Sequence, residues 1–256
     1  MTRMGVSGWL TLSFGAVFFM VPLAMTLAFS LWEGGNRYGF EAYHLLLASP
    51  QLPEAFLLSV ELALSTIAAL LLLLVPGMIF MNIYAPGLRP AFEFVATLPF
   101  VIPAIALVAG LTSLFSGPEW LIGTPFYLVI PYFFLALPFV YRALDVGLRA
   151  IDLTVLTEAG QSLGASLPQV IFLVILPSLR TALVGSALLT LAVVIGEFTF
   201  ANVLLFRTFA VFMNQVGRHE AQGAAALSVA AFLLTWAAML AVLVAGRGKT
   251  KSPGDA

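Results

Sequence analysis

The chain has 256 residues, of which 61% are hydrophobic and only 9% are charged. A soluble domain of this length carries about a quarter charged residues, so this chain cannot cover a water-facing surface with polar side chains. The formal net charge of -1 argues against a nucleic-acid surface, and the lack of cysteine excludes disulfides and thiolate metal sites. The composition therefore predicts a protein whose main solvent is lipid.

Six apolar stretches are long enough to cross a bilayer, because a hydrocarbon core about 30 Å thick requires about 20 residues in helical form. Lipid offers the backbone no hydrogen-bond partner, so each stretch is expected to be a helix, and none has the alternating polarity of a β-barrel strand. The first is expected to remain a span, because a cleaved signal peptide has a shorter apolar region. The predicted spans are Trp9–Leu31, Phe56–Met81, Phe92–Phe115, Thr124–Tyr141, Leu179–Leu205 and Ala224–Ala245.

The sequence thus predicts an all-α integral membrane fold, a single transmembrane domain over residues 1–256 with its core at about 55–246. Arginine and lysine predict the orientation, since cytoplasmic loops carry an excess of them. With the N-terminus inside, only Arg37, Arg207 and Arg218 lie outside. The inside positives are Arg3, Arg89, Arg142, Arg149, Arg180, Arg247, Lys249 and Lys251. Both termini are therefore expected in the cytoplasm.

Arg142–Ser178 is the one long cytoplasmic segment, too long for a simple connector between spans. Asp152 or Thr154 can cap a short helix, expected at about Val155–Leu163, and Gly164 is a good C-terminal stop. Glu158 is expected in the first turn of this helix, where a carboxylate suits the helix N-terminus.

A second helix is expected to follow at once. Ser166 can cap it, Pro168 suits its first turn, and Pro177 marks the beginning of the fifth span. The prediction is a helix–turn–helix lying under the membrane. The alternative is an interfacial hairpin that binds no partner.

The same segment carries a spaced motif: Glu158-Ala159-Gly160, then Gly164, then Val174-Ile175-Leu176-Pro177. This resembles the cytoplasmic signature loop of ABC-importer permeases, which reads Glu-Ala-Ala, three residues, Gly, nine residues, an aliphatic, any residue, Leu-Pro. The departures are Val174 for the usual Ile and Gly160 for the second Ala. A glycine in a helix costs about 1 kcal/mol relative to alanine, so a looser helix is expected here.

The resemblance implies a permease subunit of the type I ABC-importer fold, with six transmembrane helices and a coupling loop at about residues 150–178. Its first helix would dock on an ABC ATPase subunit, with Glu158 facing a basic group. The residues assigned to coupling are Glu158, Ala159, Gly160, Gly164, Leu176 and Pro177. The chain would be a non-catalytic subunit in the bacterial cytoplasmic (inner) membrane.

The resemblance also implies partners. A second permease, expected to be a different chain, would complete the pore, and an extracytoplasmic substrate-binding protein would deliver the solute. ATP and magnesium would be bound by the partner ATPase, leaving this chain with no cofactor, catalytic residue or metal of its own. Gly248-Lys249-Thr250 looks like the end of a phosphate-binding loop, but the required earlier glycine is replaced by Leu243 and no strand precedes it.

Residues 98–103, Leu-Pro-Phe-Val-Ile-Pro, look like the Leu-Pro…Pro stretch of type I importer permeases. Gly196-Glu197-Phe198-Thr199, followed by residues 220–226, is similar to the spermidine/putrescine-like branch of these permeases. This similarity implies transport of a polyamine or another cation. The alternatives are thiamine, ferric iron, aminoethylphosphonate or an oxyanion.

Intramembrane acids normally face a cavity or a partner. Glu197 is expected either to line the solute pathway, where an unpaired carboxylate favours a cation, or to make a structural hydrogen bond to another helix. Glu61 and Glu93 are expected at the interface or in the path. Pro99 and Pro103 should kink the third span. The residues assigned to the pathway are Glu197, Phe198, Asn202, Pro99 and Pro103.

Two other classes of protein remain open. A membrane enzyme would require paired acids or histidines at one interface, but the titratable groups here lie on different spans. A secondary transporter would be favoured by an internal inverted repeat, and no clear one is present.

Overall fold

The computed structural model describes residues 6–114, 117–118 and 120–247. Arg3, Lys249, Lys251, Phe115 and the segment 248–250 of the sequence analysis lie outside these residues. Packing divides the chain into two compact units, Met1–Glu54 with Phe212–Ala238 and Ala55–Val211 with Met239–Ala256. The single domain expected from the sequence stays a prediction.

The first unit contains the N-terminal span, α1 (Val6–Ser30), and most of the C-terminal span, α13 (Ala221–Arg247). A hairpin of β1 (Trp32–Gly34) and β2 (Arg37–Tyr38) follows α1, and α2 (Glu41–Ala48) comes next. The hydroxyls of Ser30 and Tyr43 lie 2.8 Å apart and fix the end of α1 to α2. Nearly every described side chain of α1 is exposed, as expected of a helix whose solvent is lipid.

The second unit is built from helices that run from α3 to α11, with α12 (Phe209–His219) beginning at its end. In chain order its elements are α3 (Gln51–Tyr84), η1 (Pro86–Leu88), α4 (Arg89–Thr97), η2 (Leu98–Phe100), α5 (Ala104–Leu114), η3 (Pro125–Leu128), α6 (Val129–Arg149), α7 (Leu153–Ser162), α8 (Leu167–Val170), η4 (Ile171–Ile175), α9 (Leu176–Ser178), α10 (Arg180–Gly196) and α11 (Thr199–Val203).

Helix coincides with each of the six predicted spans, and the fold is all-α and integral to the membrane. Within the described residues, four helical segments are long and apolar enough to cross a membrane: Ser7–Ser30, Gln51–Tyr84, Pro125–Arg149 and Arg180–Val203. Pro86–Phe100 and Ala104–Ser113 form a broken fifth, bent by 103°. The kink expected in the third span is therefore a sharp bend, located at the prolines Pro99 and Pro103.

Two boundaries differ from the prediction. The helix of the fourth span does not end at Tyr141 but continues to Arg149, so the long cytoplasmic segment begins later than expected. The fifth span is not one helix, because α10 stops at Gly196 and α11 begins at Thr199. Polar contacts that are invisible in a hydropathy pattern stabilise both features, as described below.

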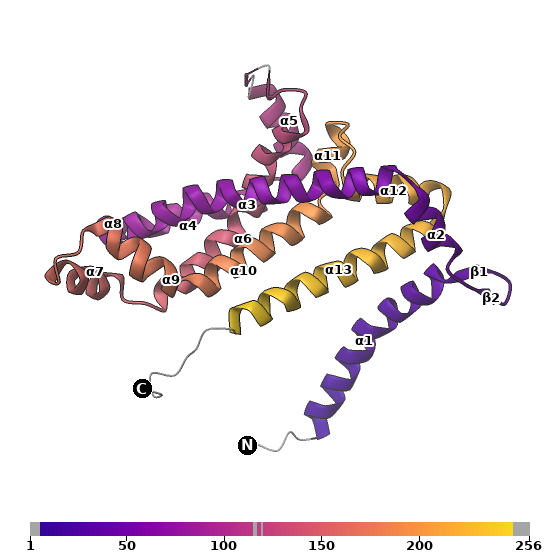
Figure 1. Cartoon of the computed structure of the whole chain (residues 1–256), viewed down its shortest axis with the longest axis horizontal. Coiled ribbons are helices and arrows are strands. Elements are labelled where there is room, and N and C mark those ends of the chain that lie inside the picture. The colour runs from indigo at the N-terminus through magenta and orange to yellow at the C-terminus, as the bar shows by residue number, and fades with distance from the viewer. Residues whose placement is uncertain (1–5, 115–116, 119, 248–256) are drawn as a thin grey trace. The chain divides into compact units, whose positions relative to one another are not determined.

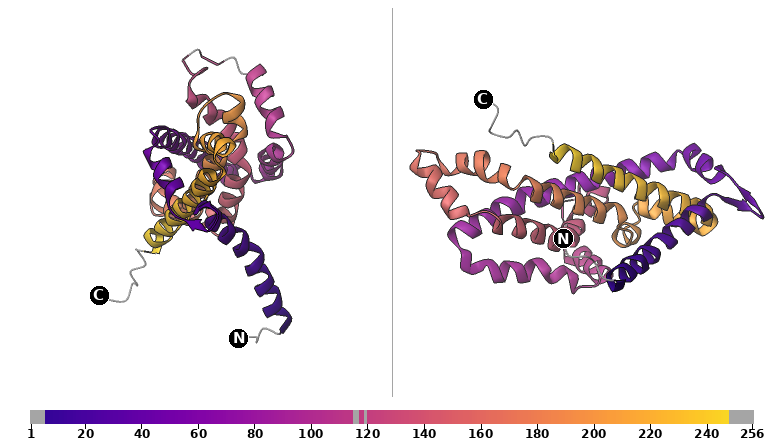
Figure 2. Two further views of the ribbon diagram at one scale, coloured as in Figure 1. Left: turned by 90° about the vertical axis from the view of Figure 1, so that its right-hand side faces the viewer. Right: turned by 90° about the horizontal axis from the view of Figure 1, so that it is seen from below.

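In the second unit α3, α6 and α10 lie alongside one another, with α7 and α8 at one end and α11 at the other (Figures 1 and 2). Gly147 of α6 allows a close approach to α10, because a Cβ atom there would lie 2.5 Å from Cβ of Ala182. One apolar core gathers near α7, around Met78, Val140 and Leu148. A second core gathers near α11, around Tyr132 and Phe200.

Candidate functional site

The first helix of the predicted coupling loop, α7, begins with a side-chain cap. The backbone N–H of Val155 donates to Oδ1 of Asp152 over 3.0 Å, which satisfies one of the amides that a helix leaves unpaired at its start. Of the two caps that the sequence offers, Asp152 is the one used. The helix therefore begins at Leu153, slightly earlier than expected. The expectation that Glu158 lies in the first turn is wrong for this reason, because the earlier start leaves no acidic residue in that turn.

The end of α7 is a Schellman motif built on Gly164, which has a φ of +84°. The N–H of Gly164 donates to the carbonyl of Gln161 over 2.9 Å, and the N–H of Ala165 donates to the carbonyl of Gly160 over 3.0 Å. A positive φ is easy only for glycine. Gly164 thus stops the helix, as its place in the sequence predicted.

Gly160, the departure from the resembled motif, lies against α8. A Cβ atom on Gly160 would lie 2.5 Å from Cγ2 of Val170, whose residue is only 1% exposed. The side chain of Val170 therefore occupies the space that an alanine methyl would fill. The expectation of a looser helix stays a prediction, and the space of the missing methyl group is filled by a packed valine.

The second half of the loop begins with a cap and ends in a distorted helix. Oε1 of Gln169 accepts from both the backbone N–H and the hydroxyl of Ser166, over 2.7 and 3.0 Å. A π-helical turn, η4, precedes Pro177, which has no N–H to continue the ladder. The hydroxyl of Ser178 donates to the carbonyl of Val174 over 2.7 Å, so the disturbed turn is partly satisfied by a side chain.

Two side chains fix α7 to the body of the unit, and the opposite face is exposed. Leu153 and Thr157 are buried. Glu158 and Ala159 are exposed, and near them Val155 and Leu163 are 57% and 89% exposed. An acidic group among exposed apolar side chains on a rigidly capped helix is a surface suited to another protein rather than to water.

A buried ionic cluster lies directly beside this loop. The carboxylate of Asp145 on α6 accepts from Nη2 of Arg89 over 3.0 Å and from Nε of Arg149 over 2.8 Å. The sequence pattern gave no functional role to Asp145 or to the two arginines, whose charges served only to predict the orientation. The available signal was an acid in an otherwise acid-free span, four residues before an arginine.

At the other end of the unit, Glu197 caps α11. Its Oε1 accepts from the N–H of Thr199 over 2.6 Å and from that of Phe200 over 3.0 Å, while Oε2 lies 3.1 Å from the latter nitrogen. The residue is only 7% exposed. Its carboxylate is therefore hydrogen-bonded to amides of its own predicted span, and is neither the unpaired charge nor the bond to another span expected from the sequence.

The other residues assigned to the pathway lie on α11 and beside α5. Phe198 is half-buried against the second core, together with Ala104 of α5, whereas Asn202 is exposed. Pro99 and Pro103 flank the bend between α4 and α5. Glu61 is exposed on α3. The pathway role of these residues stays a prediction.

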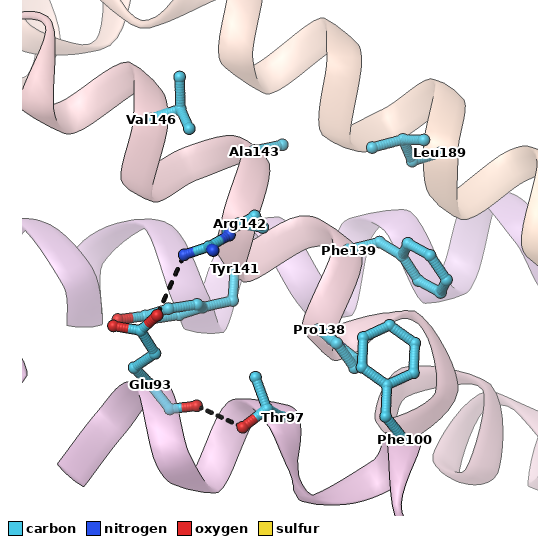
Figure 3. A pocket seen from close by; sticks show the side chains of 10 residues that line it. All are labelled: Glu93, Thr97, Phe100, Pro138, Phe139, Tyr141, Arg142, Ala143, Val146 and Leu189. Atoms are coloured by element: carbon cyan, nitrogen blue, oxygen red, sulfur yellow. Dashed lines mark hydrogen bonds and ion pairs between the residues drawn. The ribbon is translucent and has the colours of Figure 1, made fainter. Parts of the chain in front are cut away.

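A shallow pocket of about 560 Å³ lies between α4, α6 and α10 (Figure 3). Glu93 accepts from Nη1 of Arg142 over 3.0 Å at one side of it. The rings of Phe100 and Phe139 meet edge to face at the other, with centroids 5.1 Å apart. Glu93, expected at the interface or in the path, is therefore paired with an arginine that the sequence analysis had counted as a loop charge.

Among the described residues, no group of three or more histidine, aspartate or glutamate side chains gathers as a metal site. The site is thus a capped helix hairpin with an exposed acidic–apolar face and a buried ionic cluster beside it.

No protein-family model and no curated protein matches this chain. Solved structures do match it. One is a chain of a bacterial alginate ABC transporter in complex with an alginate pentasaccharide-bound periplasmic protein, with a TM-score of 0.69, 18% identity and coverage of 96% of this chain and 94% of that one. Another is a chain of a bacterial ABC transporter involved in the import of the acidic polysaccharide alginate, with a TM-score of 0.67, 15% identity and coverage of 97% and 99%. This chain shares their fold over nearly its whole length.

Proposed function

We propose that this chain is the transmembrane permease subunit of an ATP-driven importer. The observation that carries the proposal is the coupling loop: the motif found in the sequence folds as a capped helix, α7, that presents Glu158 on an exposed face. The fold shared with chains of bacterial ABC transporters supports the same role. The chain would lie in the bacterial cytoplasmic membrane with both termini inside.

The partners follow from this role. ABC ATPase subunits would bind α7 and supply ATP and magnesium, a second permease would complete the pore, and an extracytoplasmic binding protein would deliver the solute. The binding-protein partner is supported by the periplasmic protein in the similar complex. The exposed apolar residues Val155 and Leu163 would bury against the ATPase, and the carboxylate of Glu158 would meet a basic group there.

For the solute, a polyamine or another small cation is the proposal made from the sequence. The similar transporters carry an acidic polysaccharide. The capping role of Glu197 removes the argument for an unpaired acid in the path. The pocket of Figure 3 pairs an acid with an arginine, so it gives no preference for one sign of charge. Thiamine, ferric iron, aminoethylphosphonate and oxyanions remain alternatives.

The proposal is tested by Glu158→Lys. Reversing this exposed charge is expected to abolish uptake of the ligand that the cognate binding protein retains on purification, while membrane insertion stays normal because the side chain makes no buried contact. Gln161→Lys is a matched control, because Gln161 is also exposed on α7 and lies outside the motif. Unchanged uptake by Glu158→Lys would remove the coupling role.

A biochemical test separates this proposal from a secondary transporter. Purification of the chain from its native membrane should bring down an ATPase whose ATP hydrolysis is inhibited by vanadate, and uptake should show the same inhibition. Uptake that persists under vanadate and collapses with the ion gradient would instead establish a secondary transporter.

A further inference from the structure

The buried Asp145 requires an explanation that the docking surface does not provide. Its side chain is 3% exposed although it lies on a helix that crosses the membrane. A charge in such a place is unfavourable unless it is paired, and membrane proteins keep such groups where they function. Each carboxylate oxygen accepts from one arginine, Oδ1 from Arg89 and Oδ2 from Arg149.

The cluster connects two elements that are distant in the sequence. Arg89 is the first residue of α4 and thus begins the bent third span. Arg149 is the last residue of α6, three positions before Asp152, which caps α7. A polar pocket of about 400 Å³ is lined by Arg89, Arg149 and Asp152 together. Asp145 therefore ties the beginning of α4 to the end of α6, and α7 begins shortly after that end.

Apolar packing makes this link stiff. Leu144 and Leu148, on either side of Asp145 in the sequence, are buried in the same core as Leu153 of α7. Helices that share a packed core move as bodies, because such a core does not deform continuously. A displacement of α7 is therefore passed to α6 by packing, and from α6 to α4 through the carboxylate of Asp145.

A second ion pair joins the same two helices and serves as a comparison. Glu93 of α4 and Arg142 of α6 are also 3.0 Å apart, but their side chains are 41% and 68% exposed. An exposed pair contributes little, whereas removing one partner of a buried pair leaves an uncompensated charge. The side chains of Arg89 and Arg149 are 31% and 56% exposed, so Asp145 is the buried member of its cluster. Its pairing with Arg89 is thus the less exposed of these two ionic contacts between α4 and α6.

We propose that Asp145 is a positioning residue that makes α4 follow α7 when a partner ATPase moves α7. This inference rests on the proposed transport function. The absence of cysteine from the chain makes a direct test simple, because engineered cysteines are its only labelling sites. Gln161→Cys on α7 and Val95→Cys on α4 replace exposed side chains, and neither belongs to the residues proposed to bury against the ATPase.

The experiment measures the distance between nitroxide labels at these two positions by pulsed electron paramagnetic resonance. The sample is the complex with its copurified ATPase in lipid nanodiscs, without nucleotide and after trapping with ATP and vanadate. In the otherwise unchanged chain the distance should be the same in both states, because α4 follows α7. In Asp145→Asn the two states should differ by about 2 Å or more, the scale of helix shifts in switching proteins.

Two further variants keep the test decisive. Arg89→Gln leaves Asp145 paired with Arg149 and should reproduce the nucleotide-dependent shift even if Asp145→Asn fails to insert. Glu93→Gln removes the exposed pair on the same helices and should behave like the unchanged chain. The positioning role would be overturned if Asp145→Asn and Arg89→Gln each showed the same label distance with and without trapped nucleotide. This holds also if that distance differs from the distance in the unchanged chain by the same amount in both states.

The two proposals fail in different ways. If no vanadate-sensitive ATPase copurifies with the unchanged chain, the transport function is wrong. If the unchanged complex hydrolyses ATP and both variants keep a constant distance, only the role of Asp145 is wrong.

Discussion

The helices α7 and α11 lie at opposite ends of the second unit and are built on the same plan. Each begins with an acidic side chain that accepts backbone N–H groups, Asp152 in α7 and Glu197 in α11. Each ends in a Schellman motif with a residue of positive φ, Gly164 at +84° and Leu205 at +61°. The sequence predicted the first helix as a separate element, whereas it placed the second inside one continuous fifth span.

The difference lies in which residues occupy the special positions. Aspartate and glycine are the usual residues for an N-cap and a left-handed C-terminal stop, so the two ends of α7 can be predicted from the sequence. Glutamate is a less usual cap, and leucine pays a steric penalty at positive φ. In α11 the tertiary environment overrides these local preferences, because the buried amides of Thr199 and Phe200 have the carboxylate of Glu197 as their partner.

The largest effect is expected for Glu197→Ala. It removes a charged acceptor from two amides at a buried helix start, and we expect a loss of about 3 kcal/mol in the free energy of unfolding in detergent. Hydrogen exchange should rise at Thr199 and Phe200. Glu197→Gln keeps an acceptor oxygen and should lose much less. Equal losses in both variants would show that the negative charge of Glu197, rather than its acceptor oxygen, stabilises the folded chain.

Gly160→Ala should be next, with a loss of about 2 kcal/mol from overpacking against Val170. The valine side chain is β-branched and cannot easily turn away. Val170→Ala should suppress much of the loss, because it removes the valine methyl group that occupies the space of the new alanine methyl group. A double-mutant cycle by thermal unfolding measures this coupling. Additive losses would contradict the close packing of α7 on α8.

Asp152→Ala tests the exposed counterpart of Glu197. Loss of an N-cap side chain typically removes about 1 kcal/mol, and water can replace the acceptor here because Asp152 is exposed. Asp152→Asn should be nearly neutral. The measurement is thermal unfolding together with hydrogen exchange at Val155. A loss as large as that of Glu197→Ala would mean that burial does not set the difference between the two caps.

The smallest effect is expected for Leu205→Gly. The side chain is 91% exposed, so little packing is lost, and glycine relieves the backbone strain at a φ of +61°. Glycine also loosens the unfolded chain, so the net gain should be about 0.5 kcal/mol. Gly164→Ala is the opposite substitution, at a φ of +84°, and should lower the free energy of unfolding by about 1 kcal/mol in the same assay. A loss in Leu205→Gly would show that the leucine side chain is needed for contacts of its own.

The helical spans were predictable because hydrocarbon thickness and backbone hydrogen bonding leave a chain of this composition few alternatives. The loop hairpin was predictable because its caps and stops are local. The break before α11 and the extension of α6 to Arg149 were not, since both depend on polar groups whose partners a hydropathy pattern does not reveal. The roles assigned to Glu158 and to the pathway residues remain predictions.

The sequence by itself determined that the chain is helical, lies in lipid and carries a short capped helix with Glu158, predicted at about Val155–Leu163 and observed at Leu153–Ser162. These features depend on composition, periodicity and contacts within a few residues. Only the tertiary structure decided that Val170 fills the space beside Gly160, that Glu197 accepts from the first amides of α11, and that Asp145 joins Arg89 of α4 to the end of α6. Arg89 and Asp145 are 56 positions apart, and no local rule relates two charges at that separation until packing brings them together.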